Sequence, residues 1–300
     1  MTHLRTTTLL AALLATTTPL AAQVSEPQYA LEEVSDGLWR YVAGNYVSMV
    51  WVTDDGIAVL DTLNDDAARW LSDELKKRFE QPIRYVIYSH SHYDHVYGGE
   101  VFDQPGVTFV AQEQAYQDLQ RSKANAVLPD LTFEDTLRLR LGNETLVLRH
   151  HGPNNGRGSV SMQFERADVM YVVDWIVLGR MPYQNLKGYD IHGMISSTRD
   201  VLDLDWETFV GGHADTGDRT DVERYLSYLE TLYNGVLQGM LDGKSLETIQ
   251  SDLMLEEFSD LAKFEEWRAQ NIAGVYETLD DTSYVLMRPE VSNPQDDSGN

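Results

Sequence analysis

The most informative stretch of this chain reads Ser89-His90-Ser91-His92-Tyr93-Asp94-His95. Three histidines and an aspartate lie close together there. Without a metal ion, a loop would offer their donor atoms few partners. Imidazole nitrogens and carboxylate oxygens suit zinc, iron or manganese. Alternate residues of an extended chain point the same way, so His90 and His92 can hold one ion while Asp94 and His95, on the turning backbone, reach a second. The sequence therefore predicts a metal site with these four ligands.

The segments on either side of this loop alternate between strand and helix patterns. An apolar strand is predicted over 83–88, so the metal site should lie at the carboxyl end of a sheet strand. Upstream, Asp54-Asp55-Gly56 between apolar runs predicts a hairpin turn, and apolar spacing over 65–79 predicts a helix. Further strands are predicted over 38–42, 47–52, 57–60, 107–111, 137–141, 145–148, 160–164 and 169–173, with a helix near 113–120.

The last third of the chain has a helical pattern. Apolar residues from Val222 to Met240 recur at three- and four-residue spacing, and Gly243 marks the end of this helix. Helical stretches follow over 245–255 and 261–279. The apolar stripe on these helices predicts either core packing or the contact face of a homodimer.

Length and composition indicate one catalytic domain. The 300 residues are 42% hydrophobic, which is enough to bury a single large core. Arg5, a short apolar run and a small-residue exit at Ala21-Ala22 predict a cleaved leader and a periplasmic or secreted protein. No second long apolar segment follows, so we expect no stable membrane insertion after leader cleavage. The predicted parts are a signal peptide over 1–22, a domain over 23–288 with a helical extension over about 221–280, and a disordered tail over 289–300.

Cysteine content and charge narrow the function classes. The chain has no cysteine, which excludes disulfides, thiolate ligands and a cysteine nucleophile, so any metal must sit on nitrogen and oxygen. Its formal net charge of −25 repels nucleic acid phosphates and anionic lipids. We therefore expect a small-molecule substrate and no nucleic acid partner.

The histidine loop also carries a family signature. The run His90-Ser91-His92-Tyr93-Asp94-His95, followed by Gly98-Gly99, resembles the His-X-His-X-Asp-His signature of the metallo-β-lactamase superfamily. The resemblance covers roughly residues 31–240. It implies an αββα sandwich, in which two mixed β-sheets pack face to face with helices outside and the metals lie at one edge.

More distant residues fit the same family in chain order. Asp174, after the apolar strand at 169–173, is similar to the acid that bridges two metals, and His213, after Gly211-Gly212, resembles the last metal-binding histidine. Asp61, after Val59-Leu60, resembles a carboxylate that the family places near the site as support. The resemblance thus adds Asp174 and His213 to the predicted ligands.

One position departs from the family pattern. The family usually supplies a third histidine to the first metal, whereas Gly152-Pro153-Asn154-Asn155-Gly156 places Asn155 there. An amide oxygen is a weaker zinc donor than imidazole, so the site of His90 and His92 should be weak, water-filled or empty. Two alternatives remain for the nearby histidines: a changed loop path brings His151 to the metal, or His150 and His151 are ordinary strand-end residues.

The resemblance implies a zinc-dependent hydrolase that uses a metal-bound hydroxide to cleave a cyclic amide, lactone, ester or thioester. Asp94 would orient the attacking water and accept its proton. Asn155, where it does not bind metal, would donate its amide N–H to a developing oxyanion. The implied cofactor is one or two zinc ions, with iron left open. Two other classes stay open: an iron-binding redox enzyme of the same fold, and a non-catalytic metal- or ligand-binding protein, for which Asn155 is the main argument.

Overall fold

The computed structural model describes residues 29–213, 215–281 and 283–291, and the strands of this part form two sheets. In the first sheet, seven strands run in the order β1 to β7: Tyr29–Ser35, Leu38–Ala43, Tyr46–Thr53, Gly56–Leu60, Ile83–Ile87, Thr108–Gln112 and Leu131–Phe133. The second sheet has the order β12-β11-β10-β9-β8, where β8 to β12 are Thr136–Leu141, Glu144–His150, Val160–Phe164, Val169–Val172 and Thr208–Gly211. Both sheets are mixed, as the αββα prediction requires, and that prediction is confirmed.

The first sheet is antiparallel from β1 to β4 and parallel from β4 to β7. The predicted turn at Asp54-Asp55-Gly56 joins β3 to β4. Because β4 and β5 are parallel, with Leu60 paired to Ile87 near their carboxyl ends, Asp61 and the histidine loop leave the sheet at the same edge.

The second sheet is antiparallel from β8 to β11, and β12 joins β11 in parallel. Asp174 and His213 follow these two parallel strands and therefore leave this sheet at one edge. The N–H of Val47, on β3, donates to the carbonyl of Gly212 at 2.8 Å. The edges that carry the predicted ligands of each sheet consequently lie beside each other.

Apolar side chains fill the space between the sheets. Trp51 of β3 and Phe164 of β10 meet edge to face, with ring centroids 5.7 Å apart. β11 is buried along its whole length, which explains its continuous apolar sequence. β10 is equally buried, although Ser161 and Gln163 alternate with its apolar residues. Members of this core with no exposed surface include Met49, Leu60, Ile87, Leu146, Leu148, Met162 and Tyr171.

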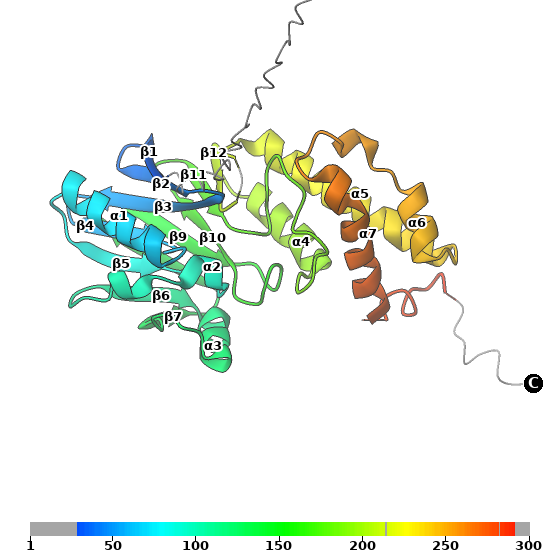
Figure 1. The fold of residues 1–300 in the computed structure, drawn as a ribbon, viewed down its shortest axis with the longest axis horizontal. Helices are drawn as coiled ribbons and strands as arrows, with labels where there is room; N and C mark the ends of the chain where they lie inside the picture. The colour runs from blue at the N-terminus through cyan, green and yellow to red at the C-terminus, as the bar shows by residue number, and fades with distance from the viewer. Residues whose placement is uncertain (1–28, 214, 282, 292–300) are drawn as a thin grey trace, which may run out of the picture.

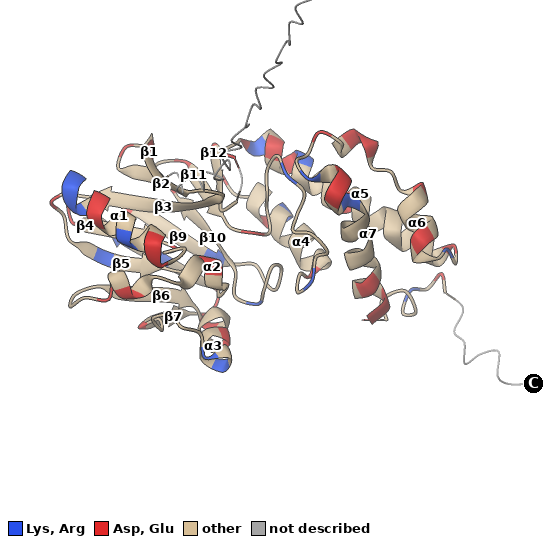
Figure 2. Cartoon of the chain, viewed as in Figure 1, with Lys and Arg blue, Asp and Glu red and all other residues tan. Residues whose placement is uncertain are grey.

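Helices α1 (Asp65–Arg78), α2 (Tyr93–Val96) and α3 (Glu113–Ser122) cover the outer side of the first sheet (Figure 1). At the start of α1, Asn64 accepts a hydrogen bond from the N–H of Ala67 at 3.0 Å, and acidic first-turn and basic last-turn residues suit the helix dipole. Figure 2 shows charged residues mainly on helices and loops, whereas the strands are mostly uncharged.

The remaining helices gather beside the second sheet, at the other end of the molecule (Figure 1). They are α4 (Ile191–Leu202), α5 (Arg219–Leu241), α6 (Leu246–Asp252) and α7 (Phe264–Asp281). Short 3-10 helices lie at Gly99–Val101 and Glu256–Phe258. The predicted stripe on α5 is buried in a core shared by these helices, so the core-packing alternative is confirmed. Of the described helices, none combines the length and apolar content needed to cross a membrane.

All predicted strands and helices are present, but β1, β7, β12, α4 and the short helix α2, in the predicted histidine loop, were not predicted. α4 contains Ser196-Ser197-Thr198, whose side chains compete for backbone hydrogen bonds and weaken the helical signal. Burial of the apolar side chains Ile191, Met194 and Val201 in the core shared with the neighbouring helices overrides that weak propensity. The predicted signal peptide at 1–22, and the predicted tail from residue 292 onward, lie outside the described residues.

Candidate metal centre

Several segments bring polar side chains to one edge of the sandwich. The loop after β5 and the short helix α2 supply residues from the first sheet, and the turns after β11 and β12 supply residues from the second. The side chains predicted as ligands all reach this edge: His90, His92, Asp94, His95, Asp174 and His213. The structure therefore brings together distant residues, such as His95 and His213, which are 118 positions apart in the sequence.

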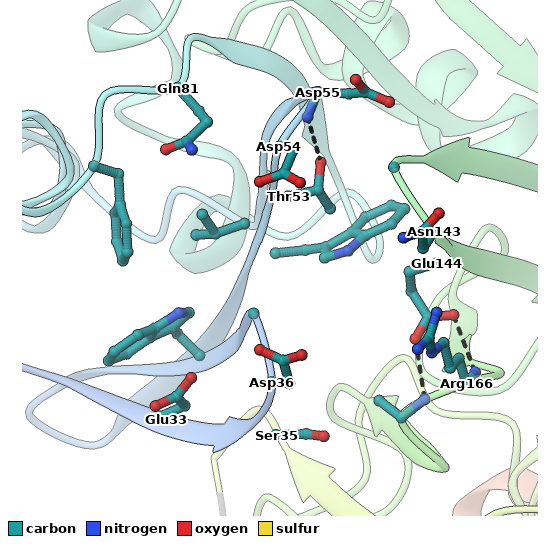
Figure 3. Close-up of a pocket in the computed structure, with 17 residues that line it drawn as sticks. Glu33, Ser35, Asp36, Thr53, Asp54, Asp55, Gln81, Asn143, Glu144 and Arg166 are labelled. Atoms are coloured by element: carbon teal, nitrogen blue, oxygen red, sulfur yellow. Dashed lines mark hydrogen bonds between the residues drawn. The ribbon is translucent and has the colours of Figure 1, made fainter.

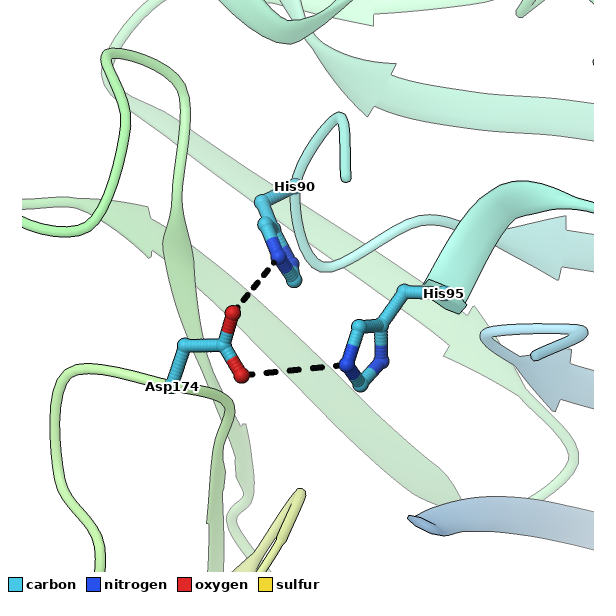
Figure 4. A group of neighbouring side chains, drawn as sticks. All are labelled: His90, His95 and Asp174. Atoms are coloured by element: carbon cyan, nitrogen blue, oxygen red, sulfur yellow. Dashed lines mark ion pairs between the residues drawn. The ribbon is translucent and has the colours of Figure 1, made fainter. Parts of the chain in front are cut away.

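Asp174 occupies the middle of this cluster. Its Oδ2 lies 3.0 Å from Nε2 of His90 and 3.2 Å from Nδ1 of His92, and its Oδ1 lies 2.9 Å from Nε2 of His213. Figure 4 shows Asp174 facing both His90 and His95. Burial opposes ionisation of Asp174, but His90 and the other facing histidines hold the pKa of this carboxyl well below its ordinary value.

Two groups of donor atoms could each hold an ion. One consists of His90, His95 and Asp174 and the other of Asp94, His95 and His213, and the donor atoms of each group lie within 4.8 Å of one another. His95 belongs to both, and its Nε2 lies 3.0 Å from Nε2 of His213. This sharing places the two groups side by side.

Asp61 orients two of these rings. Its Oδ2 lies 3.1 Å from Nδ1 of His95 and accepts the Ser89 hydroxyl at 2.6 Å, while its Oδ1 accepts the Ser89 N–H at 2.7 Å. Since the Ser89 hydroxyl proton goes to Asp61, the Ser89 oxygen accepts from Nδ1 of His90 at 2.8 Å. In the neutral rings Nδ1 is thus the protonated nitrogen, and each Nε2 keeps a lone pair for a metal.

Two buried atoms of the cluster test whether a metal fits. Nε2 of His90 and Oδ1 of Asp174 have no hydrogen-bond partner within the part of the chain that the structure describes. A buried polar atom without a partner costs about 1–3 kcal/mol, and a cation between these donors would satisfy both. Burial opposes charge on His95, yet the surrounding carboxylates raise its pKa to about 9, so a metal ion must displace a proton from this ring. The donors present fit a metal ion.

Comparison with known proteins identifies the family. The sequence profile of the Metallo-beta-lactamase superfamily matches residues 41–213, which is more than half of the chain. The chain belongs to this superfamily.

Individual relatives within the superfamily are distant. The chain is 24% identical over 250 residues to the 2,4-dinitroanisole O-demethylase subunit alpha of Nocardioides sp. strain JS1661, covering 82% of this chain and 73% of that one. A metallo-beta-lactamase from Pontibacter korlensis superposes with a TM-score of 0.61 at 17% identity, covering 68% of this chain and 99% of that chain. The stereoselective inverting sec-alkylsulfatase Pisa1 from Pseudomonas sp. superposes with a TM-score of 0.69 at 18% identity, covering 83% of this chain and 50% of that one. At these identities the structural likeness shows the fold alone.

Asn155 stands where the superfamily is expected to supply a third histidine. Its Nδ2 lies 2.5 Å from Oδ2 of Asp174, and because an ionised carboxylate can only accept, the amide presents its N–H to the cluster. The loop that bears Asn155 packs on α4. At Gly193 of this helix, the carbonyl of Pro153 lies so close that a side chain would not fit. The role of Asn155 as an oxyanion donor stays a prediction, since in this arrangement Asp174 accepts its N–H.

The two strand-end histidines lie outside both donor groups. Nε2 of His150 lies 2.7 Å from the carbonyl of Arg157. Nε2 of His151 lies 2.8 Å from the hydroxyl of Ser161, and Nδ1 lies 3.3 Å from Asp200. Both ring nitrogens of His151 are therefore engaged, and the structure agrees with the strand-end alternative rather than with the changed loop path.

Two residues that contribute to the site were not predicted. No role was predicted for Ser89; its position directly before His90 was the one signal in the sequence, because its contact with Asp61 depends on the fold. The ring of Tyr46 lies edge-on to His213 at 5.1 Å, and no local pattern pointed to it. Burial and the charge of Asp94 raise the pKa of Tyr46, so its hydroxyl keeps its proton at neutral pH.

A separate hollow of about 630 Å³ lies at the opposite end of β5 (Figure 3). It is lined by the turns between strands, including Asp54, Asp55 and Glu144, and by Gln81, which precedes β5. His90 follows the other end of that strand, so none of the predicted ligands lines this hollow.

Proposed function

We propose that this chain is a zinc-dependent hydrolase of small molecules. The observation that supports this most is the carboxylate of Asp174, whose oxygens lie within 3.2 Å of nitrogens of His90, His92 and His213. A carboxylate placed in this way can bridge two cations. Nitrogen and oxygen donors without sulfur suit zinc, and iron is the alternative that the same donors allow.

The chemistry divides between the ions and the chain. When bound, zinc acts as a Lewis acid and lowers the pKa of water toward neutrality. Asp94 borders the cluster, with Oδ2 3.8 Å from Nε2 of His213 and 22% of its side chain exposed. Because it faces both solvent and the donor cluster, we assign Asp94 the orientation of water and the acceptance of its proton. Tyr46 remains protonated beside His213 and is a hydrogen-bond donor for the substrate.

The substrate panel follows from charge and from the relatives. A net charge of −25 disfavours nucleic acids. The cleaved bond that we predict is a cyclic amide, lactone, ester or thioester. The relatives are named as an O-demethylase of 2,4-dinitroanisole and as a sec-alkylsulfatase, so an aryl methyl ether and a secondary alkyl sulfate belong in the panel as well.

The test combines metal analysis with turnover. Protein purified without added metal is assayed for bound elements and for hydrolysis of the panel, before and after zinc addition. We expect bound zinc, loss of turnover with chelator and its recovery with zinc. His95→Ala should lose both metal and turnover, whereas the matched variant His192→Ala, on α4, should keep both.

Each other outcome favours a different function. Turnover that survives both chelator and His95→Ala would contradict the proposal. A coloured, iron-containing protein without hydrolysis would favour the redox enzyme. Bound zinc without turnover of any panel member would favour the binding protein.

We also propose export and self-association. The leader pattern at residues 1–22 supports a periplasmic or secreted location, and a mature chain beginning at Gln23 in the native host would agree with it. Leu286 and Met287 are 62% and 66% exposed, which supports a homodimer face near the end of the chain. A monomer in sedimentation at micromolar concentration would rule out that face.

A further inference from the structure

A pocket of about 500 Å³ borders the metal centre on the side of His213. Its wall combines three distant parts of the chain: β2 with Arg40, the loop after β11 with Arg180, and the start of α7, with Lys263 directly before the helix and Trp267 in its first turn. Because His213 belongs both to this wall and to the donor cluster, a molecule in the pocket lies beside the proposed reaction site.

The pocket is cationic although the chain carries a net charge of −25. Three cations, Arg40, Arg180 and Lys263, line it against one carboxylate, Asp215, among the described residues. Arg40 and Lys263 each pair with a glutamate, at 3.1 and 3.2 Å. Arg180 forms no ion pair within the described chain, and its Nε is buried without a hydrogen-bond partner. A guanidinium stays charged and carries five N–H donors, so Arg180 has hydrogen bonds left to give.

Arg180 is also held in position before any ligand binds. Its guanidinium carbon lies 5.6 Å from the ring centroid of Trp267. The N–H of Met181 donates to the carbonyl of Ala262 at 3.0 Å, and the N–H of Ala262 donates to the carbonyl of Gly179 at 2.9 Å. These bonds tie the helical extension to the loop on both sides of Arg180. A cation fixed in this way loses less conformational entropy on binding.

We propose that the substrate is a small organic anion whose carboxylate or sulfate group is bound by Arg180. The planar guanidinium can donate two parallel hydrogen bonds to such an oxyanion, whereas the compact ammonium of a lysine matches its geometry less well. Trp267, which Tyr183 contacts edge-on at 5.5 Å, offers aromatic surface to the apolar part of the same molecule. The inference rests on the proposed function, since it names the substrate class of that site.

Anion binding can be measured without turnover. Chelator-treated and zinc-loaded full-length protein are titrated by calorimetry with benzenesulfonate, with benzoate and with the neutral methyl phenyl sulfone. We expect the anions to bind more tightly than the sulfone. Arg180→Gln should weaken their binding about tenfold to a hundredfold, and Arg180→Lys should weaken it less. Arg138→Gln removes an exposed arginine that pairs with Glu165 on the far part of the second sheet, and it should change nothing.

Two results would overturn the inference: equal binding of sulfone and anions, or equal anion affinity in wild type and Arg180→Gln. Arg180→Lys keeps the test valid if the glutamine variant does not fold. The metal-free titration separates this inference from the proposed function. Anion binding that depends on Arg180, without hydrolysis, would support the anion pocket and count against the hydrolase. Hydrolysis in a protein that binds the sulfone as tightly as the anions would support the hydrolase and count against the anion pocket. The tighter of the two anions identifies the oxyanion.

Discussion

Replacing Asp61 with asparagine should weaken metal binding although Asp61 is not among the predicted ligands. Asp61 is fully buried, and its Oδ2 faces the Ser89 hydroxyl, the Tyr171 hydroxyl and Nδ1 of His95. In Asp61→Asn an NH₂ group replaces one carboxylate oxygen. If it replaces Oδ2, the two hydroxyls can rotate to accept from it. The neutral ring of His95, which is the form that binds a metal, can accept only by carrying its proton on Nε2 instead of Nδ1.

That proton would occupy the nitrogen that a metal needs. Nε2 of His95 belongs to both donor groups, so both ions would be affected. Loss of a carboxylate that orients a ligand histidine typically weakens metal affinity 10- to 100-fold, or about 1.4–2.7 kcal/mol. We expect Asp61→Asn to fall in this range.

Competition with a chromophoric chelator measures the affinity for zinc. Asp130→Asn is the matched control, because Asp130 also accepts a backbone N–H, from Phe109 at 3.0 Å, but lies away from the cluster. A zinc affinity of Asp61→Asn within about twofold of wild type, or an equal loss of zinc affinity in Asp130→Asn, would refute this role of Asp61.

Three further changes test other parts of the structure. Asn155→His should raise the zinc bound per chain, because imidazole is a stronger donor than an amide, and unchanged elemental content would show that this side chain does not reach an ion. Gly193→Ala should lower the free energy of unfolding by about 1–3 kcal/mol, since the new Cβ would lie 1.7 Å from the carbonyl oxygen of Pro153. A loss below about 0.5 kcal/mol in denaturant titration would show that the loop yields easily. Burial lowers the pKa of His151 below its ordinary 6.5 although Asp200 opposes this, so the folded state holds the ring neutral and its stability falls as pH drops below 6.5. His151→Gln should show a shallower loss between pH 7 and 5 in thermal unfolding, and identical slopes would contradict that assignment.

Local patterns were sufficient for much of this fold. The alternating pattern of β10, the apolar run of β11, the turn between β3 and β4 and the helical spacing of α5 are properties of short segments, and each was predictable. The metal ligands of the histidine loop were equally predictable, because they lie within a few residues of one another. By contrast, α4 contains Ser196-Ser197-Thr198, whose weak helix propensity is overridden by the packing of Ile191, Met194 and Val201 in the folded core.

The contacts that support the metal ligands and the anion pocket could not be predicted, for a different reason. The hydrogen bonds from Ser89 to Asp61 follow from the register of β4 against β5, which only the folded sheet defines. Arg180 and Trp267 are remote in sequence, and each taken alone resembles an ordinary surface residue. Asn155 marked a departure in the sequence, but only the structure shows that its N–H reaches Asp174.

The metal donors come from both sheets, and this has a mechanical consequence. An ion held by His95 and His213 would join positions 118 residues apart and so act as a reversible cross-link between the two layers of the sandwich. A covalent link that closes a loop of about 100 residues restrains the unfolded chain by roughly 4–5 kcal/mol in polymer models, which is comparable to the whole stability of many small domains. In a chain without cysteine, no disulfide can supply such a staple. Surroundings that withhold the metal would then lower the stability of the fold as well as remove its proposed catalytic activity.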